Sequence, residues 1–235
     1  MSNTKTIKGA LFDKDGTLFD FASTWEAWAL AFLKRMGRDE AHVRQLAGLI
    51  GFDVDAQKFR NDSIVIAGTS GEVARELMSG LEGWSHAQIE DVLNTEAAQA
   101  PQAEAVPLKP FLGQMKAAGL KLGVATNDAE MPALAHLKQA DVTGYFDFIA
   151  GFDSGFGGKP APGQMQGFCK AVKLAPEEVI MVGDSLHDLH AGQAAGMRWV
   201  GVLTGLASKA ELSPFAEVVL PDIGHIPAWL GLKKG

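Results

Sequence analysis

Several residue types are scarce in this chain, and each shortage excludes a class of protein. The single cysteine, Cys169, excludes an internal disulfide and fits a reducing compartment. The apolar run nearest the N-terminus, Ala27–Leu33, is far shorter than the roughly 20 residues of a membrane-spanning helix. The segment Met1–Lys8 is polar and lacks the apolar centre of a signal peptide. These absences predict a soluble, cytoplasmic protein with no membrane partner.

Basic residues are also in short supply. The chain has 21 Lys and Arg against 28 Asp and Glu, which gives a net charge of −7. Nucleic acids and anionic membranes favour basic surfaces, so we expect no nucleic-acid partner. The 235 residues, 47% of them hydrophobic, suffice for one large domain or for a core domain with an insertion.

Three zones follow one another along the chain. Residues 1–20 hold one strand and an acidic loop, residues 21–106 show helical periodicity without strand alternation, and residues 107–235 alternate strands with helices. Strands separated by helices favour parallel pairing with right-handed crossovers. We therefore predict an α/β fold with a Rossmann-like parallel sheet flanked by helices. In this prediction residues 1–20 and 107–235 form the α/β core, where the candidate catalytic residues described below lie, and residues 21–106 are inserted as a small all-helical cap domain.

The inserted zone has two features that concern function. A predicted helix over residues 21–36 places Trp25, Trp28 and Phe32 on one side, a spacing that indicates the core of the cap. Residues 51–71 are predicted to be loop with a short turn. Three cations of the zone can contact a second anionic group of a substrate or can be ordinary surface charges, and these are Arg44, Lys58 and Arg60.

The most informative stretch is the end of the first predicted strand. The apolar run Ala10–Phe12 leads into two carboxylates, Asp13 and Asp15, and then a glycine turn at Gly16. Open parallel sheets bind ligands at the carboxyl ends of their strands, although a strand that ends in Asp is also an ordinary way to begin a turn. One residue separates the two acids, so they start on opposite sides of an extended backbone. One acid can therefore attack or bind a metal while the other transfers a proton.

Polar residues also follow three later strands. Thr126 and Asn127 come after the strand at residues 122–125, where a hydroxyl and turning backbone amides can bind phosphate oxygens. Lys159 follows a glycine-rich loop, and its ammonium can offset negative charge on a nucleophile or phosphoryl group. Asp184 follows the strand at residues 179–182, and Asp188 comes one helical turn later.

These carboxylates imply a cation. If their strands are neighbours, Asp184 and Asp188 lie beside Asp13, and three acids around one point repel strongly. A hard divalent cation that takes oxygen ligands, such as Mg²⁺, would offset that repulsion. The sequence therefore predicts a magnesium-dependent site that binds phosphate.

The order of these motifs resembles the four motifs of the haloacid dehalogenase-like (HAD) hydrolases. Each motif alone is weak, but four in the right order, each after a predicted strand, are specific. The resemblance covers residues 7–20 and about 107–220, and the run 15–20 with Lys-Pro-Ala-Pro at 159–162 is most similar to the phosphoglycolate-phosphatase-like branch. The motifs are Asp13-Lys14-Asp15-Gly16-Thr17, Thr126, Lys159-Pro160, and Gly183-Asp184 with Asp188.

The resemblance implies roles for the acids. Asp13 would be the nucleophile that forms an aspartyl-phosphate. Asp15 would be the general acid for the leaving alcohol and then the general base for the hydrolytic water. Mg²⁺ would be bound by the carboxylates of Asp13 and Asp184 and by the backbone carbonyl of Asp15.

The same resemblance implies how the phosphoryl group is held. Thr126 and the backbone amide of Asn127 would bind its oxygens. Lys159 would stabilise negative charge on the nucleophile and the phosphate. Asp188 would position Lys159 or a metal-bound water.

The expected function is Mg²⁺-dependent hydrolysis of small organic phosphomonoesters, and the resembling branch suggests phosphoglycolate. Dehalogenating and phosphonate-cleaving members of the family resemble this chain but lack an acid at the position of Asp15, so that residue counts against both. A sugar-phosphate mutase is the alternative that keeps this acid. A second alternative, a non-catalytic binding module, is disfavoured by the intact set of Asp13, Asp15, Lys159 and Asp184. Neither the oligomeric state nor the cap residues that set specificity can be predicted from the sequence.

Overall fold

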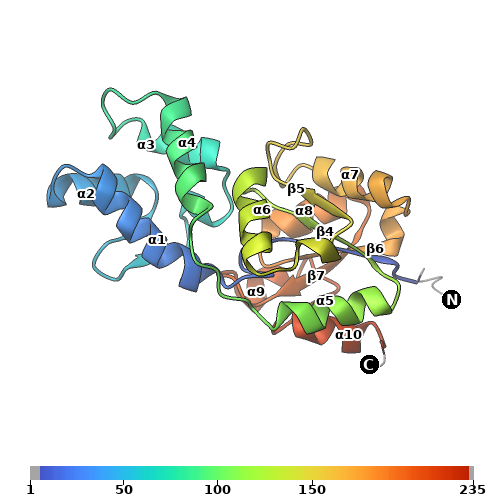
Figure 1. Cartoon of the computed structure of the whole chain (residues 1–235). Helices are drawn as coiled ribbons and strands as arrows, with labels where there is room; N and C mark the ends of the chain where they lie inside the picture. Colours follow the sequence, from blue (N-terminus) through green and yellow to red (C-terminus); the bar gives the residue numbers. More distant parts are fainter. Residues whose placement is uncertain (1–5, 233–235) are drawn as a thin grey trace.

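A six-stranded parallel sheet forms the centre of the computed structural model, which describes residues 6–232 (Figure 1). The strand order is β5-β4-β1-β6-β7-β8. β1 lies in the interior, parallel to β4 on one side and to β6 on the other. The predicted Rossmann-like α/β class is confirmed. The strands are β1 (Gly9–Phe12), β4 (Lys121–Ala125), β5 (Phe148–Ala150), β6 (Val179–Gly183), β7 (Arg198–Val202) and β8 (Val218–Leu220).

Helices cover both faces of the sheet because successive strand residues point to opposite sides. Ala10 and Phe12 belong to a buried cluster with α5 and α10, whereas Leu11 belongs to a second cluster with α7 and α8. None of the described helices is long and apolar enough to cross a membrane. The helices are α5 (Leu108–Ala117), α6 (Glu130–Gln139), α7 (Gly163–Val172), α8 (Leu186–Ala195), α9 (Lys209–Leu212) and α10 (Ile226–Trp229).

The segment inserted after β1 lies to one side of the sheet, in blue to green in Figure 1. It has its own buried apolar cluster, which includes Trp25, Phe32 and Leu46. Side chains that accept hydrogen bonds from the first turn define where its helices begin, as Asp20 does for α1 and Asp39 for α2. The helices are α1 (Phe21–Met36), α2 (Glu40–Leu49), α3 (Ser70–Leu77) and α4 (His86–Ala97), with a 3₁₀ turn at Ile64–Ile66.

One expectation for the inserted segment needs correction, because it is not wholly helical. Two antiparallel strands, β2 (Phe52–Asp53) and β3 (Lys58–Phe59), form a small hairpin in the stretch predicted as loop. The Asp53 carboxylate accepts hydrogen bonds from the backbone of Asp55 and Ala56 and so fixes the turn. The rings of Phe52 and Phe59 pack edge to face, 5.0 Å apart. Strands of two residues are too short for alternation to reveal them in the sequence.

Two connections join this segment to the sheet, and they run side by side. The backbone N–H of Asp20 donates to Ala103, and that of Ala105 donates to Leu18. The first connection ends where α1 begins, at Phe21. The cap boundaries at residues 21 and 106 stay a prediction. The outer ends of the predicted core, residues 1–5 and 233–235, lie outside the described residues.

Candidate active site

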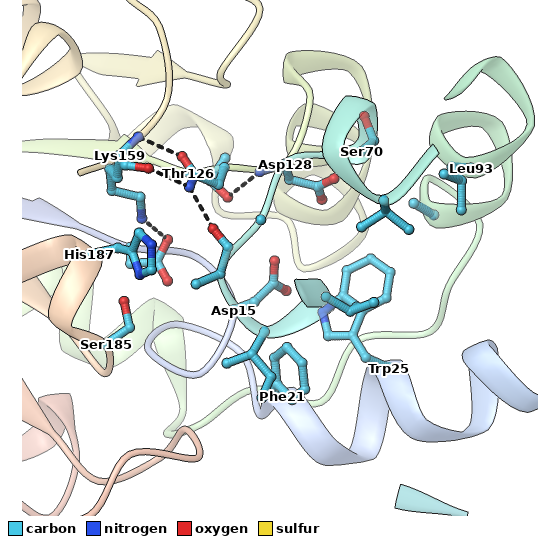
Figure 2. A pocket seen from close by; sticks show the side chains of 18 of the residues that line it. Asp15, Phe21, Trp25, Ser70, Leu93, Thr126, Asp128, Lys159, Ser185 and His187 are labelled. Atoms are coloured by element: carbon cyan, nitrogen blue, oxygen red, sulfur yellow. Dashed lines mark hydrogen bonds and ion pairs between the residues drawn. The ribbon is translucent and has the colours of Figure 1, made fainter. Parts of the chain in front are cut away.

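The residues predicted for the site come together at the carboxyl edge of the sheet. Three of them follow neighbouring strands: Asp13 follows β1, Thr126 follows β4 and Asp184 follows β6. Parallel strands bring their carboxyl ends to one edge, which explains the convergence. Figure 2 shows the pocket that results. Its lining includes Asp13, Asp15, Thr126, Asn127, Lys159, Asp184 and Asp188.

Lys159 joins two of the acids. Its Nζ donates to Asp13 Oδ1 at 2.5 Å and to Asp188 Oδ1 at 2.6 Å, and all three side chains are buried. Burial lowers the pKa of Lys159, but the charges of Asp13 and Asp188 outweigh it and raise that pKa. The ammonium therefore remains charged beside Asp13, where negative charge would develop.

Both carboxylate oxygens of Asp188 are occupied by protein donors. Ser185 caps α8, and its backbone N–H and hydroxyl donate to Asp188 Oδ2 at 3.0 and 2.7 Å. The other oxygen accepts from Lys159. The fixed carboxylate of Asp188 thereby holds the ammonium in place, a contact that agrees with one of the two roles that the family resemblance implies for it.

Three buried carboxylates form a cluster that suits a hard cation. Oxygens of Asp13, Asp184 and Asp188 lie within 4.8 Å of one another. Burial, together with neighbouring acids, raises the pKa of Asp13 to about 7 and raises that of Asp184 well above its usual range. A divalent ion with oxygen ligands would favour the ionised forms, so the donor set fits Mg²⁺.

Two glycines, Gly16 and Gly205, lie so close to the Asp184 carboxylate that a side chain at either position would collide with it. A Cβ at Gly16 would lie 2.5 Å from it, and a Cβ at Gly205 would lie 1.7 Å from Oδ2. Gly16 also has a φ of +77°, a conformation that favours glycine. The Thr17 hydroxyl donates to Asp184 Oδ1 at 3.2 Å. These contacts fix the carboxylate close to the loop that carries Asp13.

Lys14, between the two motif acids, is fully buried and contacts the second of them. Its Nζ lies 2.6 and 2.8 Å from the two oxygens of Asp15, and 3.2 Å from Asp128 Oδ2. Burial lowers the pKa of Lys14, but the carboxylates of Asp15 and Asp128 outweigh it, so the net shift is upward. Burial also raises the pKa of Asp128 to about 6 in spite of the nearby ammonium. Asp15 is thus held by a cation from its own loop.

His136 extends this contact to the inserted segment. Its Nδ1 lies 3.0 Å from Lys14 Nζ, and its Nε2 lies 2.7 Å from the carbonyl oxygen of Ala97 at the end of α4. Burial and the charge of Lys14 lower the pKa of His136 to about 4, so the imidazole is neutral at pH 7. A neutral ring that accepts from Lys14 at Nδ1 must donate from Nε2 to Ala97.

Sequence reasoning did not find this group of contacts. The available signal was Lys14 itself, a cation between two acids just after a buried strand. His136 and Asp128 offered no signal, because each is an ordinary polar residue near or on a helix until the fold places it beside Lys14.

Asn127 makes side-chain contacts beyond its predicted role. Its Oδ1 accepts from the backbone N–H of Lys159 at 2.7 Å. Its Nδ2 donates to the carbonyl of Lys159 at 2.9 Å and to that of Ala67, in the inserted segment, at 2.7 Å. Thr126 Oγ1 accepts from the backbone of Asp128 at 3.0 Å, which shapes the loop after β4. Asn127 therefore connects the Lys159 loop to the inserted segment.

The inserted segment completes the pocket with apolar side chains. Trp25, Trp28 and Phe32 pack in the segment's interior, as their spacing predicted, and they also line the pocket. The cations predicted as candidate anion contacts are elsewhere. Arg44 pairs with Asp55 at 2.8 Å and Arg60 with Asp62 at 3.2 Å, and Lys58 is exposed. None of the three is among the lining residues in the described part of the chain.

Comparison with known proteins defines the class. A family model described as "Hydrolase: haloacid dehalogenase-like hydrolase" matches residues 7–196. The chain therefore belongs to the haloacid dehalogenase-like hydrolases, and the predicted resemblance is confirmed. A protein named phosphoglycolate phosphatase from Escherichia coli O157:H7 is 30% identical over 244 residues, which covers 99% of this chain and 96% of the relative. Within the family, the protein is a phosphatase.

Solved structures share the fold across almost the whole chain. A HAD phosphatase from Thermococcus onnurineus is 20% identical with a TM-score of 0.69, covering 97% of this chain and 100% of that one. A β-phosphoglucomutase from Clostridium difficile is 21% identical with a TM-score of 0.65, covering 94% and 93%. At these identities the similarity shows the fold alone.

Proposed function

We propose that this phosphatase hydrolyses small organic phosphomonoesters through an aspartyl-phosphate on Asp13. The observation that carries the proposal is the contact of Lys159 Nζ with Asp13 and Asp188 in a buried pocket that Asp15, Thr126 and Asp184 also line. In that setting a carboxylate nucleophile has a charged donor beside it. Phosphoryl transfer needs mainly positioning and charge stabilisation.

The proposed reaction has two stages. In the first, a carboxylate oxygen of Asp13 attacks phosphorus, the ester P–O bond breaks, and Asp15 gives its proton to the leaving alcohol. In the second, Asp15 takes a proton from a water that attacks the same phosphorus. The bond between phosphorus and Asp13 then breaks, which releases inorganic phosphate and restores the free carboxylate. Lys159 and the Thr126 hydroxyl are the proposed partners of the phosphoryl oxygens, with the backbone amide of Asn127.

Mg²⁺ is part of the proposal, and the carboxylates of Asp13 and Asp184 with the backbone carbonyl of Asp15 would hold it. Asp188 is the less suitable ligand because Lys159 and Ser185 already occupy both its oxygens. When bound, the ion would neutralise charge on the carboxylates and on the phosphoryl group. A small-molecule phosphomonoester substrate and a cytoplasmic location complete the proposal.

Release of inorganic phosphate from a panel of phosphomonoesters, with and without Mg²⁺, tests this function. Phosphoglycolate belongs in the panel because relatives carry that name. We expect Asp13→Asn to abolish turnover, whereas Asp91→Asn, at an exposed acid of α4, should keep it. Comparable turnover in Asp13→Asn would refute the nucleophile. Isomerised sugar phosphate without net phosphate release would favour a mutase instead.

A further inference from the structure

The pocket has two chemically different halves. Asp15 lies between them: Thr126, Lys159 and His187 are on one side, and Phe21, Trp25 and Leu93 are on the other (Figure 2). Trp28 and Phe32, whose rings stack 5.2 Å apart, extend the apolar half along α1. A phosphoryl group beside Asp13 would leave the rest of its ester on the Asp15 side, because Asp15 is the proposed acid for the leaving oxygen. The leaving alcohol would therefore enter the apolar half.

Among the described residues, this half of the pocket is lined by no Lys or Arg that could pair with a second anionic group. Lys159 is the only lysine or arginine among the described residues that line the pocket. It is already paired with Asp13 and Asp188. His187 is the one lining histidine, and it lies beside Lys159 rather than in the apolar half. The remaining charged lining residues are all acids. The buried Lys14 already pairs with Asp15 and Asp128 and has no exposed surface with which to contact a ligand. A carboxylate on the leaving group would therefore be desolvated without a partner, which is strongly unfavourable.

Neutral polar atoms are nevertheless available there. Trp28 Nε1, Ser70 Oγ and Asn94 Oδ1 are buried and have no hydrogen-bond partner among the described residues. All three residues line the pocket. Buried polar atoms in folded proteins nearly always have a partner, and a ligand in the pocket is one group that can supply it for Trp28, Ser70 and Asn94. An N–H, a hydroxyl and an amide oxygen together offer both donors and acceptors, which a neutral amide or hydroxyl group on the ligand can match.

Resting on the function proposed above, we infer that the preferred substrates are phosphomonoesters of bulky, mostly apolar alcohols. Their alcohol carries a ring or branched hydrocarbon and a neutral hydrogen-bonding group such as an amide or hydroxyl, and it has no second anionic group. Phosphoglycolate, whose leaving group is small and carboxylated, is then a poor substrate, although relatives are named for it.

A matched set of substrates tests the inference with the wild-type enzyme. Benzyl, 4-carbamoylbenzyl and 4-carboxybenzyl phosphate differ mainly in the charge and polarity of one substituent, and phosphoglycolate completes the set. We expect kcat/KM for benzyl phosphate to exceed that for phosphoglycolate by roughly 100-fold, since a desolvated unpaired charge costs several kcal/mol. The carbamoyl compound should exceed the carboxyl compound by at least about tenfold.

A variant identifies the hydrogen-bonding contact. Asn94→Leu keeps the size of the side chain and removes its amide, so the ratio of kcat/KM for carbamoylbenzyl over benzyl phosphate should fall by about 3–10-fold. Thr95→Val, at the exposed neighbouring position, should keep the wild-type ratio. A ratio, unlike an absolute rate, is insensitive to the fraction of enzyme that is correctly folded.

The outcomes separate the two proposals. If no phosphomonoester, including p-nitrophenyl phosphate, releases phosphate, the proposed function itself fails. If esters are hydrolysed but phosphoglycolate or the carboxybenzyl compound has the highest kcat/KM, the substrate inference is overturned while the function stands. An unchanged carbamoyl ratio in Asn94→Leu overturns the assignment of that residue.

Discussion

Lys14→Met should show how strongly this phosphatase depends on the buried cation beside Asp15. The substitution keeps an unbranched chain in a fully buried position but removes the ammonium that faces Asp15 and Asp128. Removing one partner of a buried ion pair leaves an uncompensated charge and costs roughly 3–5 kcal/mol. We therefore expect the free energy of unfolding to fall by about that amount at pH 8. Lys116→Met, which breaks a surface pair with Asp147, should cost less than about 1 kcal/mol.

The pH dependence of this loss has a defined sign. Burial already raises the pKa of Asp128 to about 6 with Lys14 present, and without that cation it rises further. In the variant the native state then binds a proton that the unfolded state releases, so stability falls as the pH rises through this range. The loss should consequently be about 1–2 kcal/mol smaller at pH 5.5 than at pH 8.

Urea unfolding at the two pH values measures both effects, and a second substitution checks the cause. Asp128→Asn removes the stranded charge, so the double variant Lys14→Met/Asp128→Asn should recover about 1–2 kcal/mol relative to Lys14→Met. A loss below about 1 kcal/mol in Lys14→Met, or no recovery in the double variant, would refute the electrostatic account. In activity, Lys14→Met should impair alkyl phosphates more than p-nitrophenyl phosphate, because only the poorer leaving group needs a well-placed Asp15.

Three further predictions follow from other contacts. Chelation should abolish turnover, and added Mg²⁺ should restore it. Asp184→Asn should need at least about tenfold more Mg²⁺ than the wild type to reach half of its maximal rate. Equal Mg²⁺ dependence in the variant and the wild type would show that Asp184 does not bind the metal. The pKa of His136 is lowered to about 4 in the folded protein, so His136 binds a proton more readily when the protein is unfolded. Its contribution to the free energy of unfolding should therefore fall by about 2 kcal/mol between pH 7 and pH 5. Urea unfolding of the wild type and His136→Gln at both pH values measures this difference, and the same pH dependence in both proteins would contradict it. Asn127→Ala leaves the backbone N–H of Lys159 and the carbonyl of Ala67 without the partner that Asn127 supplies. We therefore expect the free energy of unfolding to fall by about 2–4 kcal/mol and hydrogen exchange near residue 67 to become faster. Unchanged exchange there would argue that Asn127 does not hold the inserted segment to the Lys159 loop.

The sequence was sufficient for the sheet and for its polar edge. Buried strands such as β1 and β6 are continuous apolar runs, and their ends are marked by Asp13 and Asp184. Strands separated by helices pair in parallel, and parallel strands present these ends together. Local chemistry and one topological rule therefore predicted which residues would meet. The hairpin of β2 and β3 escaped prediction because two-residue strands have no detectable period.

Packing decided the remaining features. Lys14 contacts His136, 122 residues away, and His136 contacts Ala97, 39 residues away, so no local pattern could reveal the network around Asp15. The aromatic spacing of α1 predicted an apolar face but could not say that part of this face would line the substrate pocket. The position of the inserted segment beside the carboxyl edge of the sheet determined which of these aromatic side chains line the pocket.

What the amino-acid order determined by itself is a parallel α/β core with acids at its strand ends, because secondary structure depends mainly on nearby residues and strands separated by helices pair in parallel. Only the tertiary structure decided which cation holds each acid and what surrounds the leaving group. Those features depend on side chains that become neighbours through burial, where an ammonium must find acceptors and an apolar wall excludes charge.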